Sequence, residues 1–538
     1  MNYDYIIVGA GSAGCALAYR LGEDPDVSVC VLEAGGTHKN PLVWIPAAVI
    51  ALVPYKIKNW AFKTTAQKAL NNRTCYQPRG RALGGSSSIN AMIYIRGVPQ
   101  DYDAWRDQGC DGWGFNDVLP YFKKSEHCEV ASTNLRGQGG PLNVARPTDP
   151  SPLNERLMAA ADELDLPLNK DFNGATQEGV GYFELTQKNG ERWSAARAYL
   201  EPAIARGNVT VISNAHVAKI NVSEVDGQKV ASGVEAIIKG QRQTILANKE
   251  VILSAGAFGS PQQLLLSGIG PKHKLEPHQI EQVHELPGVG ENLQDHPDIV
   301  LAYRSESLDT IGFSLRAGLR FFKDLFIYLT KRRGMLATNY AESGAFLYTD
   351  KSEPSPDVQF HLVRGLVDDH GRKLHWGHGY SFHICVLRPK SRGCVSLNSA
   401  EARDEPVIDI GFLTDERDMQ TLYDGMCLGQ KIAQTKAFSG VRGAPMYATE
   451  EHDEQRLKDD IRERCDTVYH PVGTCKMGHD QMSVVDSRLR VHGIQSLRVV
   501  DASIMPTLIS GNTNAPAMMI AEKAADMIKE DNAKVKPL

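Results

Sequence analysis

Residues 5–14 read Tyr5-Ile6-Ile7-Val8-Gly9-Ala10-Gly11-Ser12-Ala13-Gly14, a β-branched apolar run that passes directly into three spaced glycines. Such a run is typical of a strand buried on both faces of a parallel sheet. Residues 15–21 have helical character, and a second apolar run over residues 27–32 ends in Glu33. This order of strand, G-x-G-x-x-G, helix, strand and acid predicts an α/β dinucleotide site of the Rossmann type.

Each residue type in this motif has a physical task. Gly9 allows the tight turn, Gly11 lets backbone N–H groups approach a pyrophosphate, and Gly14 lets the helix pack on the strand. The helix N-terminus favours the phosphate charge. Glu33, 19 residues after the last glycine, can accept both hydroxyls of an adenosine ribose. The motif alone does not distinguish FAD from NAD.

Length and composition exclude several classes of protein. The 538 residues exceed the usual size of one domain, which predicts two packed domains. A net charge of −5 without a Lys/Arg block argues against nucleic-acid binding. The 10 cysteines contain no CxxC pair and are interpreted as reduced thiols of a cytoplasmic protein. The N-terminus lacks a basic n-region, so we expect a retained strand and no signal peptide.

Three further segments carry recognisable patterns. Residues 78–90 form a loop rich in glycine and serine, and residues 249–261 form a buried strand that ends in small residues. Near the C-terminus, residues 469–474 read Tyr469-His470-Pro471-Val472-Gly473-Thr474, and Asn514 follows His470 by 44 residues. With the N-terminal motif, these segments span about residues 3 to 528 and closely resemble the glucose–methanol–choline (GMC) oxidoreductase family.

The resemblance implies an architecture of two domains. An FAD-binding α/β domain of doubly wound, Rossmann-like type would be built discontinuously from residues 1–150, 200–300 and 460–538. An α+β substrate domain with an antiparallel sheet would comprise residues 151–199 and 301–459. Alternating apolar and polar residues over 358–363 and 380–386 agree with strands in that sheet.

The same likeness implies which residues line the FAD. They are Gly9, Gly11, Ser12, Ala13, Gly14, Glu33, Ala34, Trp60, Leu83, Gly84, Gly85, Asn90, Ala91, Met92, Ile93, Val217, Ala255, Asp501, Ala502, Asn514 and Pro516. Some members of the family tether the flavin through a histidine in the serine-rich loop. Because that position is Ile89 in this chain, non-covalent FAD is predicted.

Oxidation of an alcohol requires the loss of a hydroxyl proton and of a carbon-bound hydride. Flavin N5 can accept the hydride, and the protein must supply a base and a partner for the developing alkoxide. By their match to the family's catalytic His–Asn pair, His470 is expected to be the base and Asn514 the hydrogen-bonding partner.

The leading hypothesis is an FAD-dependent alcohol dehydrogenase, similar to the choline dehydrogenase-like and aliphatic alcohol dehydrogenase branch. It would oxidise a primary alcohol to the aldehyde and pass electrons to a quinone or another acceptor. The alternatives are an oxidase that uses O2 and, more remotely, an FAD-containing hydroxynitrile lyase. Glu342 could face a quaternary ammonium, but no aromatic cage is visible in the sequence, so uncharged alcohols are favoured over choline. The sequence determines neither the alcohol nor the oligomeric state.

Five histidines lie close together in the sequence and could indicate a metal site. Its members are His361, His370, His375, His378 and His383. Their spacing matches no zinc pattern and hydride transfer to a flavin needs no metal, so no metal site is predicted. Some of these side chains could line the substrate pocket instead.

An amphipathic helix is expected after residue 314. Its apolar stripe comprises Leu315, Leu319, Phe322, Phe326 and Leu329, and its basic residues are Arg316, Arg320, Lys323 and the run Lys331-Arg332-Arg333. The favoured interpretation is a helix whose stripe packs on the substrate domain. The alternative is a basic helix that contacts the inner membrane peripherally, which would suit an enzyme that reduces a membrane quinone.

Overall fold

The computed structural model describes residues 1–130, 133–447 and 453–534, and two large sheets organise this part of the chain. The first sheet has the strand order β12-β2-β1-β15-β14-β13, with β24 paired to β15. Its strands are β1 (Asn2–Val8), β2 (Val29–Glu33), β12 (Val209–Ser213), β13 (Ala215–Val225), β14 (Gln228–Ile238), β15 (Gln241–Leu253) and β24 (Leu497–Val499). Pairing is parallel except where β14 joins β13 and β15. The predicted α/β dinucleotide fold is confirmed.

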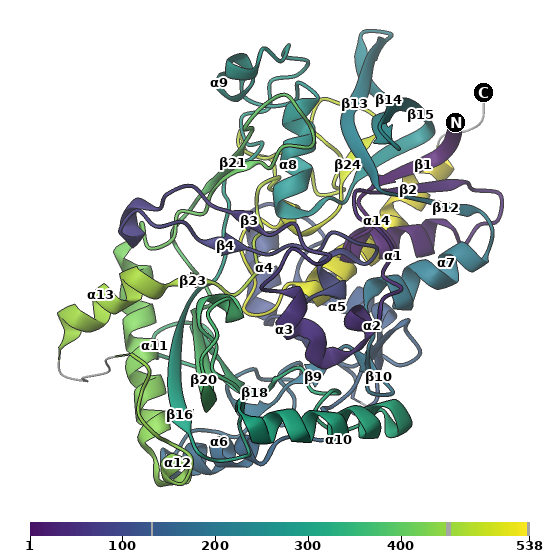
Figure 1. Ribbon diagram of the computed structural model, residues 1–538. Helices are drawn as coiled ribbons and strands as arrows, with labels where there is room; N and C mark the ends of the chain where they lie inside the picture. The colour runs from purple at the N-terminus through teal and green to yellow at the C-terminus, as the bar shows by residue number, and fades with distance from the viewer. Residues whose placement is uncertain (131–132, 448–452, 535–538) are drawn as a thin grey trace.

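The two ends of the chain meet at this sheet. The helix α1 (Ser12–Leu21) follows the glycine turn, and the C-terminal helix α14 (Asn514–Lys534) packs along it (Figure 1). Arg20 of α1 donates two hydrogen bonds to Glu522 of α14, at 2.6 and 3.1 Å. The Glu522 side chain is fully buried, so its charge depends on this guanidinium.

The second large sheet is antiparallel and has the order β23-β16-β20-β19-β18-β8, with β17 paired to β20. Its strands are β8 (Gly179–Tyr182), β16 (Pro297–Ser305), β17 (Ile311–Phe313), β18 (Ala341–Leu347), β19 (Val358–Val363), β20 (Gly377–Val386) and β23 (Asp466–Thr467). The strands expected over 358–363 and 380–386 are therefore present. Helix α11 (Glu416–Gln434) packs against β16, β19 and β20.

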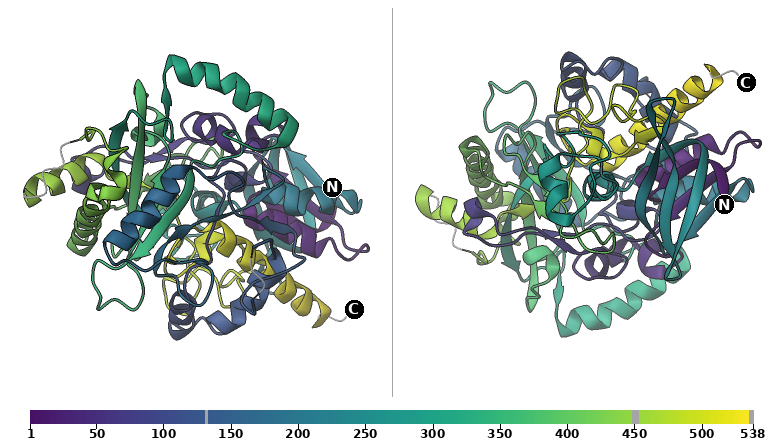
Figure 2. Two further views of the ribbon diagram at one scale, coloured as in Figure 1. Left: turned by 90° about the horizontal axis from the view of Figure 1, so that it is seen from below. Right: turned by 90° about the horizontal axis from the view of Figure 1, so that it is seen from above.

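The amphipathic helix is α10 (Leu315–Lys331), which lies at the periphery of the molecule (Figures 1 and 2). The expectation that its apolar stripe packs inward is wrong for the part that can be described: Phe322, Phe326 and Leu329 are 72%, 69% and 62% exposed. Among the side chains of this helix that the structure describes, the buried ones are instead Asp324 and Tyr328. The side chains of Leu315, Arg316 and Leu319 lie outside the described set.

None of the helices in the described ranges combines the length and apolarity that crossing a bilayer requires.

The pairing of Arg20 with Glu522 predicts a large stability effect. Replacing Arg20 by methionine leaves a buried carboxylate without its main partner, which should cost roughly 3–5 kcal/mol in the free energy of unfolding. Urea unfolding followed by circular dichroism measures this. The control is Arg242→Met, which removes an exposed guanidinium 3.5 Å from Glu235 and should cost at most about 1 kcal/mol. Equal losses in the two variants would contradict the assigned role.

Candidate active site

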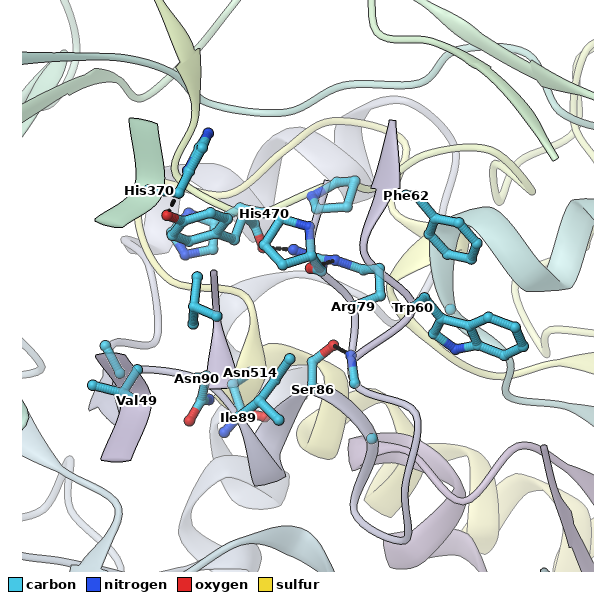
Figure 3. Close-up of a pocket in the computed structure, with 18 of the residues that line it drawn as sticks. Val49, Trp60, Phe62, Arg79, Ser86, Ile89, Asn90, His370, His470 and Asn514 are labelled. Carbon is cyan, nitrogen blue, oxygen red and sulfur yellow. Dashed lines mark hydrogen bonds between the residues drawn. The ribbon is translucent and has the colours of Figure 1, made fainter. Parts of the chain in front are cut away.

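A cavity of about 790 Å³ is lined by residues of both sheets and of the loops between them (Figure 3). Most of the residues expected to line FAD contribute to its wall. These are Gly9, Gly11, Ser12, Ala13, Glu33, Ala34, Trp60, Gly85, Asn90, Ala91, Met92, Ile93, Val217, Ala255, Asp501, Ala502 and Asn514. Gly14, Leu83, Gly84 and Pro516 do not reach the wall. Gly14 has the packing task expected of it, since a Cβ there would lie 1.9 Å from the carbonyl oxygen of Gly9.

Two glycine loops form a cradle at the start of α1. Gly9 has φ of +103°, and a Cβ there would lie 2.5 Å from the carbonyl oxygen of Ser254. A Cβ on Gly85, where φ is +52°, would lie 2.7 Å from the Cα of Gly11, so the two loops touch. No side chain caps the N-terminus of α1, and its first turn carries no acid. The free N–H groups and the helix dipole fit the diphosphate of a dinucleotide.

Glu33 and Trp60 line the adenosine end expected for such a ligand. Glu33 is buried, and its two oxygens accept the backbone N–H of Ala10 at 3.0 Å and of Gly35 at 2.7 Å. Burial raises the pKa of this carboxyl to about 7. Each oxygen keeps a lone pair for a ribose hydroxyl. Trp60 packs edge-on against His216, with ring centroids 5.6 Å apart, and so lies beside the segment of Val217.

His470 is buried at the cavity wall and has a side-chain partner at each ring nitrogen. Its Nε2 lies 3.0 Å from Nδ2 of Asn512, and its Nδ1 lies 3.0 Å from Nδ1 of His296. Asn514 has a different contact, because its Oδ1 accepts the hydroxyl of Ser12 at 2.7 Å. Figure 3 accordingly shows Asn514 apart from His470.

Sequence reasoning did not single out Asn512 or His296. The segment Gly511-Asn512-Thr513-Asn514 offers two asparagines, and spacing along the chain does not reveal which side chain meets the histidine. Asn514 is the first residue of α14. At this position its carboxamide oxygen accepts a hydrogen bond from the hydroxyl of Ser12, at the start of α1. His296 lies 174 residues before His470 and belongs to no motif considered in the sequence.

The contacts of His296 fix the tautomer of His470. His296 is fully buried, and burial lowers its pKa to about 3, so it is neutral and carries one N–H. That proton lies on Nε2, because the carbonyl oxygen of Leu387, 3.1 Å away, can only accept. Nδ1 of His296 is therefore an acceptor, and Nδ1 of His470 donates to it. The remaining nitrogen of His470, Nε2, carries an unprotonated lone pair.

Burial is the main cause that lowers the pKa of His470 well below its usual value. Electrostatic interactions with His296, His361 and Arg79 lower it further. His470 is therefore neutral at pH 7. Asn512 can donate its amide N–H to Nε2. The arrangement presents a proton acceptor and an amide donor side by side at the cavity wall.

The backbone that carries His470 is held by a buried carboxyl group and a partly buried guanidinium. Oδ1 of Asp295 accepts the N–H groups of His470 at 2.7 Å and of His296 at 2.8 Å, and burial raises the pKa of this carboxyl to about 6. Arg79 donates to the carbonyl of Tyr469 at 2.6 Å. Tyr469 adopts φ of +79°, a conformation that non-glycine residues avoid. The surrounding hydrogen bonds stabilise this strained residue next to the histidine.

The histidine cluster contributes to the cavity without forming a metal site. His361, His370, His375 and His383 line it, whereas His378 contacts the hydroxyl of Ser314 at 2.9 Å. Among the described residues, no group of three or more His, Cys, Asp or Glu side chains is placed to hold a metal ion.

Glu342 does not reach the cavity wall. Its carboxylate is buried and accepts hydrogen bonds from the Ser151 N–H, the Asn154 amide and the Thr338 hydroxyl, at 2.8, 2.7 and 2.5 Å. The structure therefore does not support the possibility that Glu342 faces a quaternary ammonium, because its oxygens accept hydrogen bonds from neighbouring protein groups.

A dinucleotide cradle with a neutral imidazole beside it is characteristic of nucleotide-dependent oxidoreductases. Two family models, both described as GMC oxidoreductase, match residues 3–298 and 389–521. The chain belongs to the GMC oxidoreductase family.

Individual relatives agree over almost the whole length. The alcohol dehydrogenase (acceptor) of Pseudomonas putida is 46% identical over 533 residues, which cover 98% of this chain and 95% of that protein. The mitochondrial choline dehydrogenase of Homo sapiens is 41% identical over 541 residues, which cover 98% of this chain and 90% of that protein. The crystal structure of pyridoxine 4-oxidase from Mesorbium loti has a TM-score of 0.87 at 31% identity, with 98% of this chain and 99% of that chain covered.

The contact between the two glycine loops predicts a defect in cofactor binding. In Gly85→Ala the new methyl group meets the Cα of Gly11 and forces the cradle apart, so the purified protein should lose most of its bound flavin, measured as yellow absorbance per protein. Gly112→Ala is the matched control. Gly112 also has positive φ, at +79°, but a Cβ there meets nothing within 4 Å. Normal flavin content in Gly85→Ala, or equal loss in both variants, would contradict the steric argument.

Proposed function

We propose that this protein oxidises a primary alcohol to the aldehyde with non-covalently bound FAD, and that His470 is the base. The observation that carries the proposal is the 3.0 Å contact between Nε2 of His470 and the Asn512 amide, at the wall of the cavity that contains the dinucleotide motif. Bound FAD would supply the acceptor for the hydride that leaves the alcohol carbon.

The chain's own residues would handle the proton and the charge. The alcohol hydroxyl would displace the Asn512 amide from Nε2 of His470 and donate to that nitrogen, while the alcohol oxygen would accept the freed N–H of Asn512. As the proton passes to His470, its Nδ1–H bond to His296 stabilises the imidazolium that forms. Asn512 stabilises the negative charge that develops on oxygen. We assign the role of alkoxide partner to Asn512, and to Asn514 the task of holding the glycine loop through Ser12.

The position of Ile89 supports non-covalent attachment. Its side chain lines the cavity in the serine-rich loop and offers no nucleophile to the flavin. The groups that would hold FAD without a covalent bond are the glycine cradle, Glu33 and Asp501. Asp501 accepts the N–H of Gly256 at 2.8 Å and so fixes the start of helix α8 (Gly256–Leu266) beside the cradle.

The cavity wall favours an uncharged, apolar alcohol over choline. The acids that line it within the described ranges are Glu33, Asp404 and Asp501. Asp501 accepts a hydrogen bond at the start of α8, and the backbone carbonyl of Asp404 accepts the Gln262 amide of the same helix. Both acids therefore belong to the nucleotide-binding side of the cavity. The wall also carries apolar residues, which include Ile50, Phe313, Leu366 and Leu374. These residues suit an aliphatic or aromatic chain.

The relatives support two possibilities for the electron acceptor. The name of the Pseudomonas putida enzyme points to a dehydrogenase with a separate acceptor, and we favour this possibility, with a quinone as the candidate acceptor, because that enzyme shares 46% identity with this chain. Pyridoxine 4-oxidase supports the second candidate, an oxidase that reduces O2. Comparison of the rates at which air and a soluble quinone reoxidise the alcohol-reduced protein distinguishes the two.

Substitutions at the three polar residues test the assigned roles. His470→Ala should keep its yellow flavin and slow anaerobic bleaching by an alcohol by roughly 10²–10⁴. Asn512→Ala should slow bleaching by roughly 10²–10³, the usual effect of removing one oxyanion donor. Stopped-flow absorbance measures both.

Asn514→Ala provides the comparison with Asn512→Ala. It should weaken retention of the flavin, while the molecules that retain flavin bleach much faster than Asn512→Ala. Slower bleaching in flavin-loaded Asn514→Ala than in Asn512→Ala would reverse the assignment, and near-normal bleaching in His470→Ala would remove His470 from the role of base.

A further inference from the structure

We propose that the outer face of α10 and the rim of the cavity dock on an anionic lipid bilayer. The apolar patch comprises Phe313, Phe322, Phe326, Leu329, Leu374 and Trp376, which are exposed by 50%, 72%, 69%, 62%, 62% and 70%. Such a concentration of large exposed apolar side chains marks an interaction surface. The docking is independent of the alcohol chemistry proposed above.

The members of the apolar patch come from neighbouring elements. Phe313 ends β17, two residues before α10 begins, and forms a parallel bridge with Trp376, the residue that precedes β20. The helix lies at the edge of the molecule in every view (Figures 1 and 2). The side chains of Phe322, Phe326 and Leu329 are exposed to solvent. The patch therefore combines exposed residues of α10 with exposed residues at and beside the edge where β17 pairs with β20.

A basic fringe accompanies the apolar patch. Arg320, Lys323, Lys331, Arg332 and Arg333 are exposed on α10 and immediately after it. Arg320, Arg332 and Arg333 pair with Asp324, Glu191 and Asp149. Within the described residues, Lys323 and Lys331 form no ion pair. An amphipathic helix with an aromatic face and lysines beside it suits the headgroup boundary of an anionic membrane.

The charge of the fringe argues against a second copy of this chain as the occupant. A symmetric dimer formed through this face would bring Lys323 and Lys331 of both copies, which have no ion-pair partner among the described residues, into one interface. Anionic lipid headgroups complement these charges instead. The net charge of the whole chain is −5, so the attraction is local to this face.

The apolar patch also borders the mouth of the cavity. Phe313 and Leu374 belong both to the patch and to the cavity wall, and Ile50 and Tyr55, exposed by 58% and 46%, lie on that wall as well. A docked molecule would therefore open its cavity toward the lipid, where apolar alcohols and quinones partition. This orientation supplies a route for both substrates from the bilayer.

The test uses the flavin-loaded protein and sedimentation with vesicles. Vesicles of phosphatidylcholine and phosphatidylglycerol in equal parts should bind the wild type, and pure phosphatidylcholine vesicles should bind it less. The variant Phe322→Ser/Phe326→Ser/Leu329→Ser should lose affinity for the mixed vesicles by at least about tenfold. The variant Lys323→Gln/Lys331→Gln should lose about fivefold per charge on the mixed vesicles only.

The matched control is Leu168→Ser/Val225→Ser/Met482→Ser, which removes three apolar residues exposed by 59%, 51% and 42% outside the apolar patch. It should bind like the wild type. The proposal is overturned if the wild type fails to sediment with mixed vesicles, or if the α10 serine variant binds as tightly as the wild type. It is also overturned if light scattering shows a wild-type dimer that the α10 serine variant converts to a monomer, since a second copy would then cover the face.

Discussion

Two buried imidazoles, with their Nδ1 atoms 3.0 Å apart, can share only one proton, and this constraint governs the active site. The carbonyl of Leu387 takes the single N–H of His296, so the shared proton must belong to His470. The cavity-facing nitrogen of His470 is thereby left unprotonated, and its lone pair accepts the Asn512 amide at 3.0 Å. A histidine whose tautomer is fixed in this way is ready to receive a proton and needs no carboxylate in contact with its ring.

The fold delivers these groups from the ends of its elements. His296 immediately precedes β16, Leu387 immediately follows β20, and His470 lies just beyond β23. Adjacent pairing of β16 with β20 and with β23 brings the three together. Asn512 comes from the loop before α14, the helix that packs on α1 of the dinucleotide fold. The reactive cluster therefore sits where the antiparallel sheet meets the nucleotide-binding part of the chain.

Much of this architecture could be predicted, for reasons that are local. The strand, glycine turn, helix and acid of residues 5–33 are adjacent in sequence. The alternation of apolar and polar residues over 358–363 directly predicts the strand β19. The choice between Asn512 and Asn514 could not be predicted, because it depends on where α14 begins relative to α1. The role of His296 depends on strand pairing across 174 residues. The outward face of α10 was mispredicted because periodicity reveals an apolar stripe and does not reveal what covers it.

The central claim is the protonation state of His470, and nitrogen NMR of the ¹⁵N-histidine-labelled protein tests it most directly. The signals of His470 are assigned by their absence in His470→Gln. The account predicts one protonated nitrogen, Nδ1, and one unprotonated nitrogen, Nε2, at pH 7. This pattern should persist as the pH falls through about 6.5, where an ordinary histidine titrates, because the pKa of His470 is held well below that value. A protonated Nε2, or an imidazolium at pH 7, would contradict the account.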